Sequence, residues 1–335
     1  MDSLTHIALG ACIGEAFAGK KIGRPALAWG GLAHSLPDID FLSGLWLDAP
    51  AALLAHRGIT HSWFFVLVVS ALLVFPFRLS HPKRQMKSGF VFLFFSSAMG
   101  LHILLDSLNN YGTGWWEPFN HTRVSFNTLF VVDPLFSIVP GICFLILVIR
   151  RATAGRRAVV WKTGLTVPAI YIMISFFFRE IIQSDVSRIL ARQGISYERF
   201  MTAPVPFQTV LHYTVIQCEG GYYIGYRSIF DKQENLQLCY ILQRKGLLEL
   251  TNEPSDAELL RLFSQGYFSV DSIGDDLYFH DLRFGEIQGW TGTYKGPIFS
   301  YNLSGGNDPL VLQRGRSADL NLAGLRSLWK RMKGL

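Results

Sequence analysis

The chain has 335 residues, of which 50% are hydrophobic and only 17% are charged, and its mean hydropathy is +0.25. Because soluble domains carry about 25% charged residues, this composition disfavours a disordered chain and a basic nucleic-acid-binding domain, and 4 cysteines are too few for a disulfide-stapled secreted scaffold. The net charge of +6 comes wholly from residues 1–178, which hold 14 Lys and Arg against 8 Asp and Glu. An integral membrane protein with a soluble part is the class that remains.

Four apolar runs are long enough to be membrane-spanning helices, which need about 20 apolar residues. They cover residues 63–79, 89–105, 129–149 and 158–178. Two shorter stretches, residues 4–19 and 25–36, precede them, and each can span a thin bilayer, form half of a re-entrant hairpin or lie at the interface. The predicted fold is therefore mainly α. Residues 1–178 form a polytopic membrane bundle with four clear spans and two short N-terminal helices, and residues 179–335 form a small α+β soluble domain.

The basic residues of the membrane half are sorted into alternate connections. Residues 20–24, 78–87 and 150–162 hold 12 of the 14 Lys and Arg. The positive-inside rule places these connections in the cytoplasm, so the N-terminus, the other connections and everything after residue 178 face outward. We expect a multi-pass protein of the bacterial inner membrane whose C-terminal domain is extracytoplasmic.

Acids and histidines collect on the predicted outer side, and three acid–histidine pairs are spaced four residues apart: Asp2/His6, His34/Asp38 and His102/Asp106. Residues i and i+4 of a helix lie on one face, and an imidazole with a carboxylate suits zinc or a similar divalent ion. The simpler interpretation of one such pair is a helix-end histidine hydrogen-bonded to a neighbouring acid. Pro37 disfavours helix just before it, so the geometry of the His34/Asp38 pair stays open.

Two further segments add donors near these pairs, because residues 56–62 contain two histidines and residues 37–40 contain two aspartates. The candidate metal ligands are Asp2, His6, His34, Asp38, His56, His61, His102 and Asp106. We expect two or three divalent ions, most simply zinc, with manganese as the alternative. Asp40 or Asp38 would orient an attacking water, and Arg57 would hold a phosphate by a bidentate contact. The alternative for Arg57 is an ion pair with Asp38 or Asp40.

Four motifs occur in chain order: MDSLTH at residues 1–6, LPDID at 36–40, HRGITHS at 56–62 and GLHILLD at 100–106. With these motifs, residues 1–150 resemble the YdjM-type family of bacterial membrane-bound metal-dependent hydrolases. That family is remotely similar to zinc-dependent phospholipases C and single-strand nucleases, which are helical proteins with multi-zinc sites built from His and Asp. The resemblance implies that His6, Asp38, His61, His102 and Asp106 are metal ligands.

A site at the outer mouth of a helical bundle would meet lipid head groups. We therefore expect a phosphoesterase that acts on a lipid or lipid-linked substrate, with membrane lipid as partner and no nucleic acid. A metal or proton transporter and a non-catalytic scaffold with a structural metal site are the alternatives. A transporter should place ionisable groups near mid-membrane, whereas Glu15 is the single candidate at such depth. The sequence leaves the oligomeric state open.

The C-terminal half changes from helical to strand patterns. The expected elements are a helix over 179–194, strands over 209–218, 222–230 and 236–243, a helix over 255–265 capped by Ser255, strands over 267–273, 277–282 and 285–294, and a basic amphipathic helix over 320–335. Cys218 and Cys239 can form a disulfide if this domain is extracytoplasmic, but their spacing does not decide it. His280 and Asp281, with Arg283, either complete the active site or form a surface salt bridge, and the salt bridge is the favoured interpretation.

Overall fold

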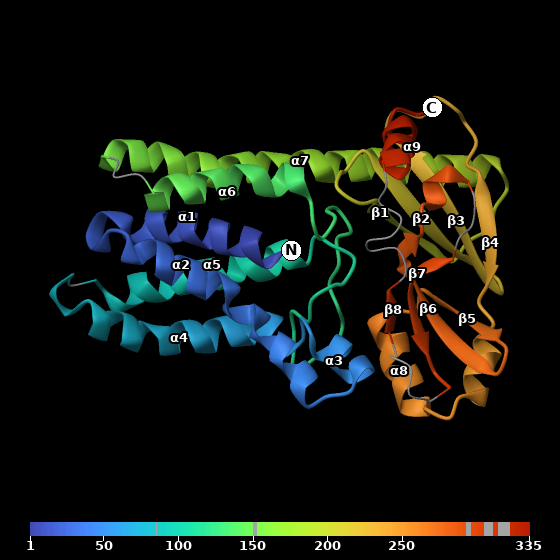
Figure 1. The fold of residues 1–335 in the computed structure, drawn as a ribbon, viewed down its shortest axis with the longest axis horizontal. Coiled ribbons are helices and arrows are strands. Elements are labelled where there is room, and N and C mark those ends of the chain that lie inside the picture. The colour runs from blue at the N-terminus through green and yellow to red at the C-terminus, as the bar shows by residue number, and fades with distance from the viewer. Residues whose placement is uncertain (85, 150–152, 293–295, 305–310, 314–321) are drawn as a thin grey trace. The chain divides into compact units, whose positions relative to one another are not determined.

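A computed structural model describes residues 1–84, 86–149, 153–292, 296–304, 311–313 and 322–335 (Figure 1). The chain forms two compact units: residues 1–45 with 55–174 are unit 1, and residues 46–54 with 175–335 are unit 2. The helices of the first half are α1 Ser3–Ile22, α2 Pro25–Ser35, α3 Ala49–Ala55, α4 Trp63–Ser80, α5 Ser88–Asp106, α6 Pro134–Ile149 and α7 Ala154–Arg192, with 3-10 segments η1 Leu36–Leu45, η2 Ile59–His61 and η3 Pro82–Arg84. The chain is mostly helical, as the composition predicts.

Three of the described helices, α4, α5 and α7, are long and apolar enough to cross a membrane. The third predicted span is shorter than expected, because α6 begins only at Pro134 and has 16 residues. Asp133 sets that start: its Oδ1 accepts hydrogen bonds from the backbone N–H groups of Leu135 and Phe136, as a helix cap does. The helices expected over 158–178 and 179–194 are one continuous helix, α7.

Helix α5 lies at the centre of unit 1, since half of its apolar window is buried against 17% for α4. Phe77 of α4 packs edge-on against Phe95 of α5, with ring centroids 5.6 Å apart, and both side chains are buried. The other side of α4 leaves Leu72 and Phe75 exposed. Such a one-sided apolar surface is what a lipid-facing helix requires.

Helices α1 and α2 approach each other backbone to backbone. A Cβ added at Gly30 would lie 2.1 Å from the Gly10 carbonyl oxygen, and one added at Gly14 would lie 1.9 Å from the Ala26 carbonyl oxygen. Only residues without larger side chains allow this approach, as in the small-residue interfaces of membrane helices. The close contact matters for function because α1 carries His6 and α2 carries His34.

Glu15 is buried on α1, and its carboxylate is paired with the Arg157 guanidinium of α7. Nε donates to Oε1 at 2.7 Å and Nη2 donates to Oε2 at 2.5 Å. A bidentate pair satisfies a charge that would otherwise be costly inside the bundle. The acid expected deepest in the membrane half therefore has a structural partner.

Unit 2 contains two antiparallel four-stranded sheets. The first has the order β1 Arg199–Pro204, β2 Leu211–Cys218, β3 Gly221–Ser228 and β4 Leu238–Leu242, and the second has the order β5 Phe268–Ile273, β6 Asp276–Glu286, β7 Pro297–Asn302 and β8 Val311–Gln313. The other elements are α8 Pro254–Phe263, α9 Leu322–Met332, η4 Lys245–Leu250 and η5 Gly289–Thr291. The antiparallel strands and two helices agree with the predicted α+β domain.

Four details of the C-terminal prediction are wrong or incomplete. Strands β1, β7 and β8 are not in the predicted set. Of the strand predicted over 285–294, only residues 285 and 286 are in a strand, because β6 ends at Glu286 and η5 follows; residues 293 and 294 lie outside the described residues. Helix α8 begins at Pro254 after Glu253, so Ser255 is not its cap. Asp281 and Arg283 do form an ion pair, at 2.6 Å, but it is buried rather than on the surface.

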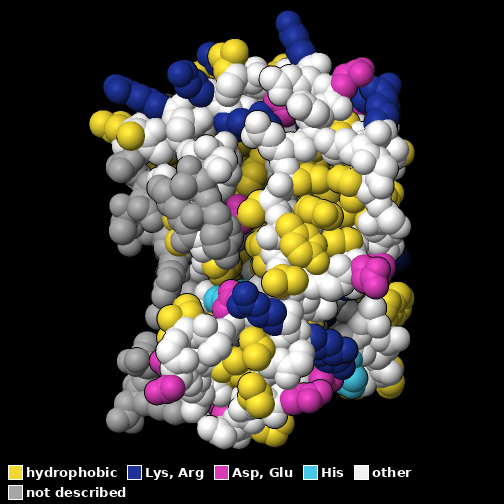
Figure 2. All heavy atoms as spheres, turned by 90° about the vertical axis from the view of Figure 1, so that its right-hand side faces the viewer, with side chains coloured by type: hydrophobic (Ala, Val, Ile, Leu, Met, Phe, Trp, Pro, Cys, Tyr) yellow, Lys and Arg dark blue, Asp and Glu magenta, His cyan; other side chains and the backbone are white. Residues whose placement is uncertain are grey.

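Cys218 and Cys239 lie in β2 and β4, which flank β3 on opposite sides, and both are free thiols. Strand β4 ends the order of its sheet, and Tyr240 and Leu242 on it are 42% and 51% exposed. A space-filling view of the side on which β4 lies in Figure 1 shows a gathering of hydrophobic side chains (Figure 2). Strand β4 is therefore an apolar, exposed edge of the sheet.

Candidate metal centre

Four donors from three segments of unit 1 converge at one point. Asp38 comes from η1, His61 from η2, and His102 and Asp106 from the last turns of α5. Each offers one ligand atom, and these atoms lie within 4.8 Å of one another. We call this set the four-donor group. The i, i+4 spacing of His102 and Asp106 on α5 places both on one helix face, as the sequence predicts.

The distances within the four-donor group are close to those of a tetrahedral ion site. The Nε2 atoms of His61 and His102 lie 3.1 Å apart. Asp38 Oδ1 is 3.4 Å from His102 Nε2 and 3.6 Å from His61 Nε2. Asp106 Oδ2 is 3.5 Å from His61 Nε2 and 3.9 Å from His102 Nε2. Ligands about 2.0–2.2 Å from an ion at the centre of a tetrahedron are roughly 3.3–3.6 Å from one another. Three of these five distances lie in that range and the other two, 3.1 and 3.9 Å, lie just outside it, so the donors could hold one metal ion after small adjustments.

A second group consists of His6, His34 and His102, whose ligand atoms also lie within 4.8 Å of one another. We call it the three-histidine group, and all three side chains are buried. Each ring has one buried nitrogen that lacks a hydrogen-bond partner among the described residues: His6 Nδ1, His34 Nε2 and His102 Nδ1. Buried polar atoms are normally paired, so three unpaired ring nitrogens close together have the chemistry of a set of metal ligands.

Two of the imidazoles are held in the orientation that a metal ligand needs. His34 Nδ1 donates to the Ala98 carbonyl oxygen at 2.5 Å, which leaves Nε2 as the nitrogen with a free lone pair. His61 Nδ1 lies 3.1 Å from Asp40 Oδ2, which leaves its Nε2 facing the four-donor group. Metal-binding histidines characteristically use their second nitrogen in this way. The arrangement supports a metal site over a set of ordinary core histidines.

Both carboxylate oxygens of Asp40 are engaged by neighbouring protein groups. Its Oδ2 accepts hydrogen bonds from the Arg57 backbone N–H at 2.7 Å and from the Thr60 hydroxyl at 2.9 Å, and its Oδ1 lies 2.8 Å from His56 Nδ1. His56 is therefore bound to Asp40 and does not belong to either donor group. These contacts make Asp40 a positioning residue for His61.

Burial and the neighbouring charged groups shift the pKa values of Asp38, Asp40 and His61 in opposite directions. Burial alone would raise the pKa of Asp38 and Asp40, but hydrogen bonds from the histidines hold both well below the usual range. Burial alone would lower the pKa of His61, but its hydrogen bonds with Asp106, Asp38 and Asp40 raise that pKa to about 9. At neutral pH, His61 therefore carries a proton that a metal ion would have to displace.

Arg57 is buried, with 4% of its surface exposed. Its Nε lies 3.0 Å from Asp106 Oδ2, and its Nη1 donates to Asn109 Oδ1 at 2.6 Å. The sequence offers a pair with Asp38 or Asp40, but the guanidinium pairs with Asp106, and it is the Arg57 backbone N–H that contacts Asp40. Arg57 adopts φ +61°, a left-handed conformation that is uncommon for a residue with a side chain. This turn directs its side chain inward.

The structure does not bring Asp2 into either donor group. Asp2 is the N-cap of α1: Oδ1 accepts from the Thr5 backbone N–H at 2.9 Å and Oδ2 accepts from the Thr5 hydroxyl at 2.6 Å. The sequence motifs do not predict two contacts of the site. Asn109 accepts a hydrogen bond from Arg57, and the amino group of Met1 contacts Asp106. Neither an amide nor a backbone amine is part of a His/Asp spacing pattern.

Metal affinity is expected to rise with pH, because the proton on His61 must leave before Nε2 can bind an ion. With a pKa of about 9 for His61 in the metal-free protein, apparent affinity should be about fiftyfold weaker at pH 7 than at pH 9 and should level off about one pH unit above that pKa. Competition with a chelator of known affinity at pH 6, 7, 8 and 9 measures it, with Co²⁺ as the ion. Asp40→Asn should move the rise to lower pH, and a flat profile in the unmodified protein would contradict the prediction.

The similarity to known proteins includes the residues that carry the two donor groups. The sequence model described as YdjM inner membrane protein matches residues 1–182. The chain is 36% identical over 125 residues to inner membrane protein YbcI of Escherichia coli strain K12, covering 36% of this chain and 69% of that protein. It is 30% identical over 145 residues to the uncharacterized protein YfhP of Bacillus subtilis strain 168, covering 41% of this chain and less than half, 43%, of that protein. No solved structure matches the chain. Every residue of the two donor groups lies inside the matched residues. The chain belongs to the YdjM inner membrane protein family.

Proposed function

We propose that this protein is a membrane-bound metal-dependent hydrolase, a phosphoesterase whose substrate is a lipid or a lipid-linked intermediate. The observation that carries the proposal is the four-donor group, where Asp38, His61, His102 and Asp106 converge at distances close to those of a tetrahedral site. Ionisable residues within membrane helices are rare and usually functional, and His102 and Asp106 of α5 are both fully buried. A mixed imidazole–carboxylate set suits zinc, and the three-histidine group next to it supports a second ion.

The residues divide into ligands and the groups that hold them. Asp38 is the ligand open to solvent, because its side chain is 24% exposed while those of His61, His102 and Asp106 are buried. Substrate would therefore enter on the Asp38 side. Asp40 keeps Nε2 of His61 turned inward, and Arg57 fixes the Asp106 carboxylate. A bound divalent ion would supply an activated water and polarise a phosphoryl oxygen.

We further propose that the site and unit 2 are extracytoplasmic, because 12 of the 14 basic residues of the membrane half lie in the three alternate connections. The native thiols provide the test, since Cys239 is exposed while Cys12 and Cys143 are buried. A membrane-impermeant maleimide should label intact spheroplasts through Cys239, and Cys239→Ser should remove most of that label. Labelling only after the membrane is opened would place unit 2 in the cytoplasm.

The function is tested on purified full-length protein loaded with zinc or manganese. We expect hydrolysis of bis-p-nitrophenyl phosphate or p-nitrophenylphosphorylcholine by the loaded protein, and its loss in His102→Ala/Asp106→Ala. Glu258→Gln, an exposed change on α8, is the control. Metal that is bound without any phosphoester hydrolysis would indicate a structural site. Hydrolysis that is unchanged in the double variant would refute the assignment of the site.

A further inference from the structure

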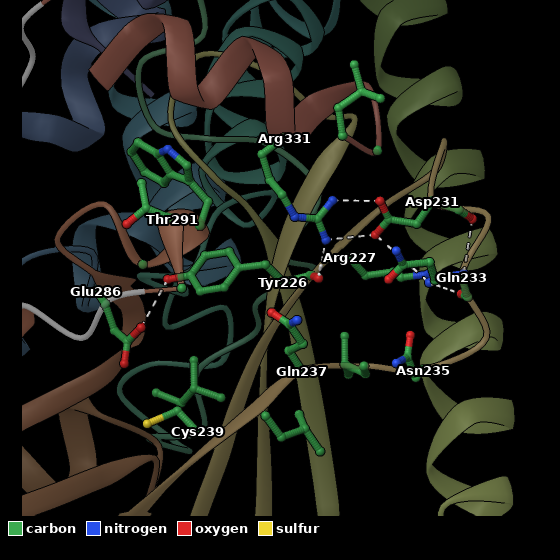
Figure 3. A pocket seen from close by; sticks show the side chains of 18 of the residues that line it. Tyr226, Arg227, Asp231, Gln233, Asn235, Gln237, Cys239, Glu286, Thr291 and Arg331 are labelled. Atoms are coloured by element: carbon green, nitrogen blue, oxygen red, sulfur yellow. Dashed lines mark hydrogen bonds and ion pairs between the residues drawn. The ribbon is translucent and has the colours of Figure 1, made fainter. Parts of the chain in front are cut away.

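Unit 2 has a pocket of its own, with a volume of about 400 Å³, which is within the range of small-molecule sites. It is lined by β3, the segment 231–239, Glu286, η5 and the C-terminal part of α9 (Figure 3). Its lining mixes two aromatic side chains, Tyr226 and Trp290, with acid, amide and hydroxyl groups. None of these residues belongs to the donor groups of unit 1.

Glu286 is a buried acid in the lining of this pocket, next to Tyr226 (Figure 3). Its side chain is 6% exposed, Oε2 accepts a hydrogen bond from the Tyr226 hydroxyl at 3.5 Å, and Oε1 is buried without a partner among the described residues (Figure 3). Burial raises the pKa of Glu286 to about 7. A buried carboxyl oxygen without a partner costs free energy, so a small shift of the Glu286 side chain toward a hydroxyl group in the pocket would be favourable.

Glycine at position 289 lets the Tyr226 hydroxyl and the Glu286 carboxylate pack directly against the backbone. A Cβ there would lie 2.1 Å from the Tyr226 hydroxyl oxygen and 2.5 Å from Glu286 Oε2. Any other residue would displace one of these two groups. The close packing of Tyr226 and Glu286 at this side of the pocket therefore depends on glycine at position 289.

The arginines of the pocket are already neutralised. Arg331 Nη1 lies 2.6 Å from Asp231 Oδ1, and Arg227 Nη2 lies 2.9 Å from Asp185 Oδ2. Lys232 is exposed at the rim. Since a phosphate or carboxylate ligand needs unpaired cations inside its pocket, the lining does not favour an anion.

We propose that this pocket binds a neutral polyhydroxylated ligand of the sugar class. Each sugar hydroxyl both donates and accepts hydrogen bonds, which matches the Glu286 carboxyl, the Tyr226 hydroxyl and the amide side chains of Asn235 and Gln237. The apolar face of a sugar ring packs against aromatic side chains such as Tyr226 and Trp290. A free saccharide and the saccharide head of a lipid share this chemistry.

The test uses full-length protein in a polyethylene-glycol detergent, because maltoside and glucoside detergents carry sugar head groups themselves. Glucose and N-acetylglucosamine are the probes, with ethanolamine and inorganic phosphate as comparators, by saturation-transfer NMR and calorimetry. We expect saturable sugar binding that is weakened at least about tenfold by Glu286→Gln. Glu258→Gln on α8 should bind like the unmodified protein.

A second variant covers the case in which Glu286→Gln unfolds. Gln237 lies exposed in the lining, and Gln237→Ala should also weaken sugar binding while leaving the melting temperature unchanged. No saturable sugar binding, or tighter binding of ethanolamine or phosphate, would overturn the proposal. If octyl glucoside below its micelle concentration binds more tightly than glucose, the ligand is lipid-linked. Removing the metal with EDTA should leave sugar binding intact, so this proposal and the hydrolase proposal fail separately.

Discussion

Replacing Asp106 with asparagine is expected to remove the metal from the four-donor group and to lower the free energy of unfolding by about 3–5 kcal/mol. Asp106 is fully buried and contacts Arg57 at 3.0 Å, His6 at 3.1 Å and the Met1 amino group. Asparagine keeps the shape but removes the charge, which leaves the Arg57 guanidinium buried without its carboxylate. Elemental analysis of the purified protein and its thermal unfolding in detergent measure the two effects.

Asp133→Asn is the matched control for this prediction. Asp133 is equally buried in the same unit, but it caps α6 and donates no ligand to either group. Because asparagine caps a helix about as well as aspartate, this replacement should change the free energy of unfolding little and should leave the metal content unchanged. Equal metal content in Asp106→Asn and the unmodified protein would show that Asp106 is not a ligand.

Replacing Gly30 with alanine is expected to separate α1 from α2 and to disrupt the three-histidine group. The new Cβ would lie 2.1 Å from the Gly10 carbonyl oxygen and 2.7 Å from Gly14 Cα, which are backbone atoms that no side-chain rotation can move away. Overpacking typically costs about 1–3 kcal/mol and more where the backbone must shift. His6 and His34 would then no longer face each other across the two helices, where their ring centroids are 5.2 Å apart.

Gly31 provides the control on the same helix. A Cβ there would meet the Ile7 carbonyl oxygen at 3.5 Å, an ordinary van der Waals contact. Gly31→Ala should therefore be neutral or slightly stabilising, because alanine favours the helix more than glycine by about 1 kcal/mol. Melting temperature and metal content report both variants, and an equal response to the two changes would contradict the role of close backbone packing.

The sequence predicts best where a local pattern decides the structure. The apolar runs predict α4 and α5 almost to the residue, and the i, i+4 spacing correctly puts His102 and Asp106 into one donor group. The other two pairs, Asp2/His6 and His34/Asp38, have the same spacing, but neither pair belongs to one donor group. Asp2 caps α1, and His34 and Asp38 join different groups because α2 ends at Ser35 and a 3-10 segment follows, as Pro37 suggests.

Long-range pairing is what the sequence cannot supply. His61 and Asp40 form a positioned pair only because η1 and η2 meet in space, and Arg57 selects Asp106, 49 residues away, over the nearer Asp38 and Asp40. In unit 2, Asp281 and Arg283 are two residues apart and do pair, but their burial depends on neighbouring elements such as Phe263 of α8, whose ring lies 4.7 Å from the Arg283 guanidinium. Charged residues in a strand give no local sign of such cover.

His102 is common to the four-donor and three-histidine groups, and this sharing links the two positions thermodynamically. Its Nε2 lies 3.1 Å from His61 Nε2, while its Nδ1 is buried and has no hydrogen-bond partner among the described residues. An ion on either nitrogen fixes the tautomer and the electron density of the whole ring. By linkage, the factor by which a first ion changes affinity for the second equals the factor by which the second changes affinity for the first. A neutral imidazole has one lone pair, so an ion on one nitrogen of His102 would leave the proton on the other, and a second ion would bind there only after displacing that proton. The coupling between the two positions would therefore be negative near neutral pH, and a titration would report two unequal affinities whose ratio depends on pH.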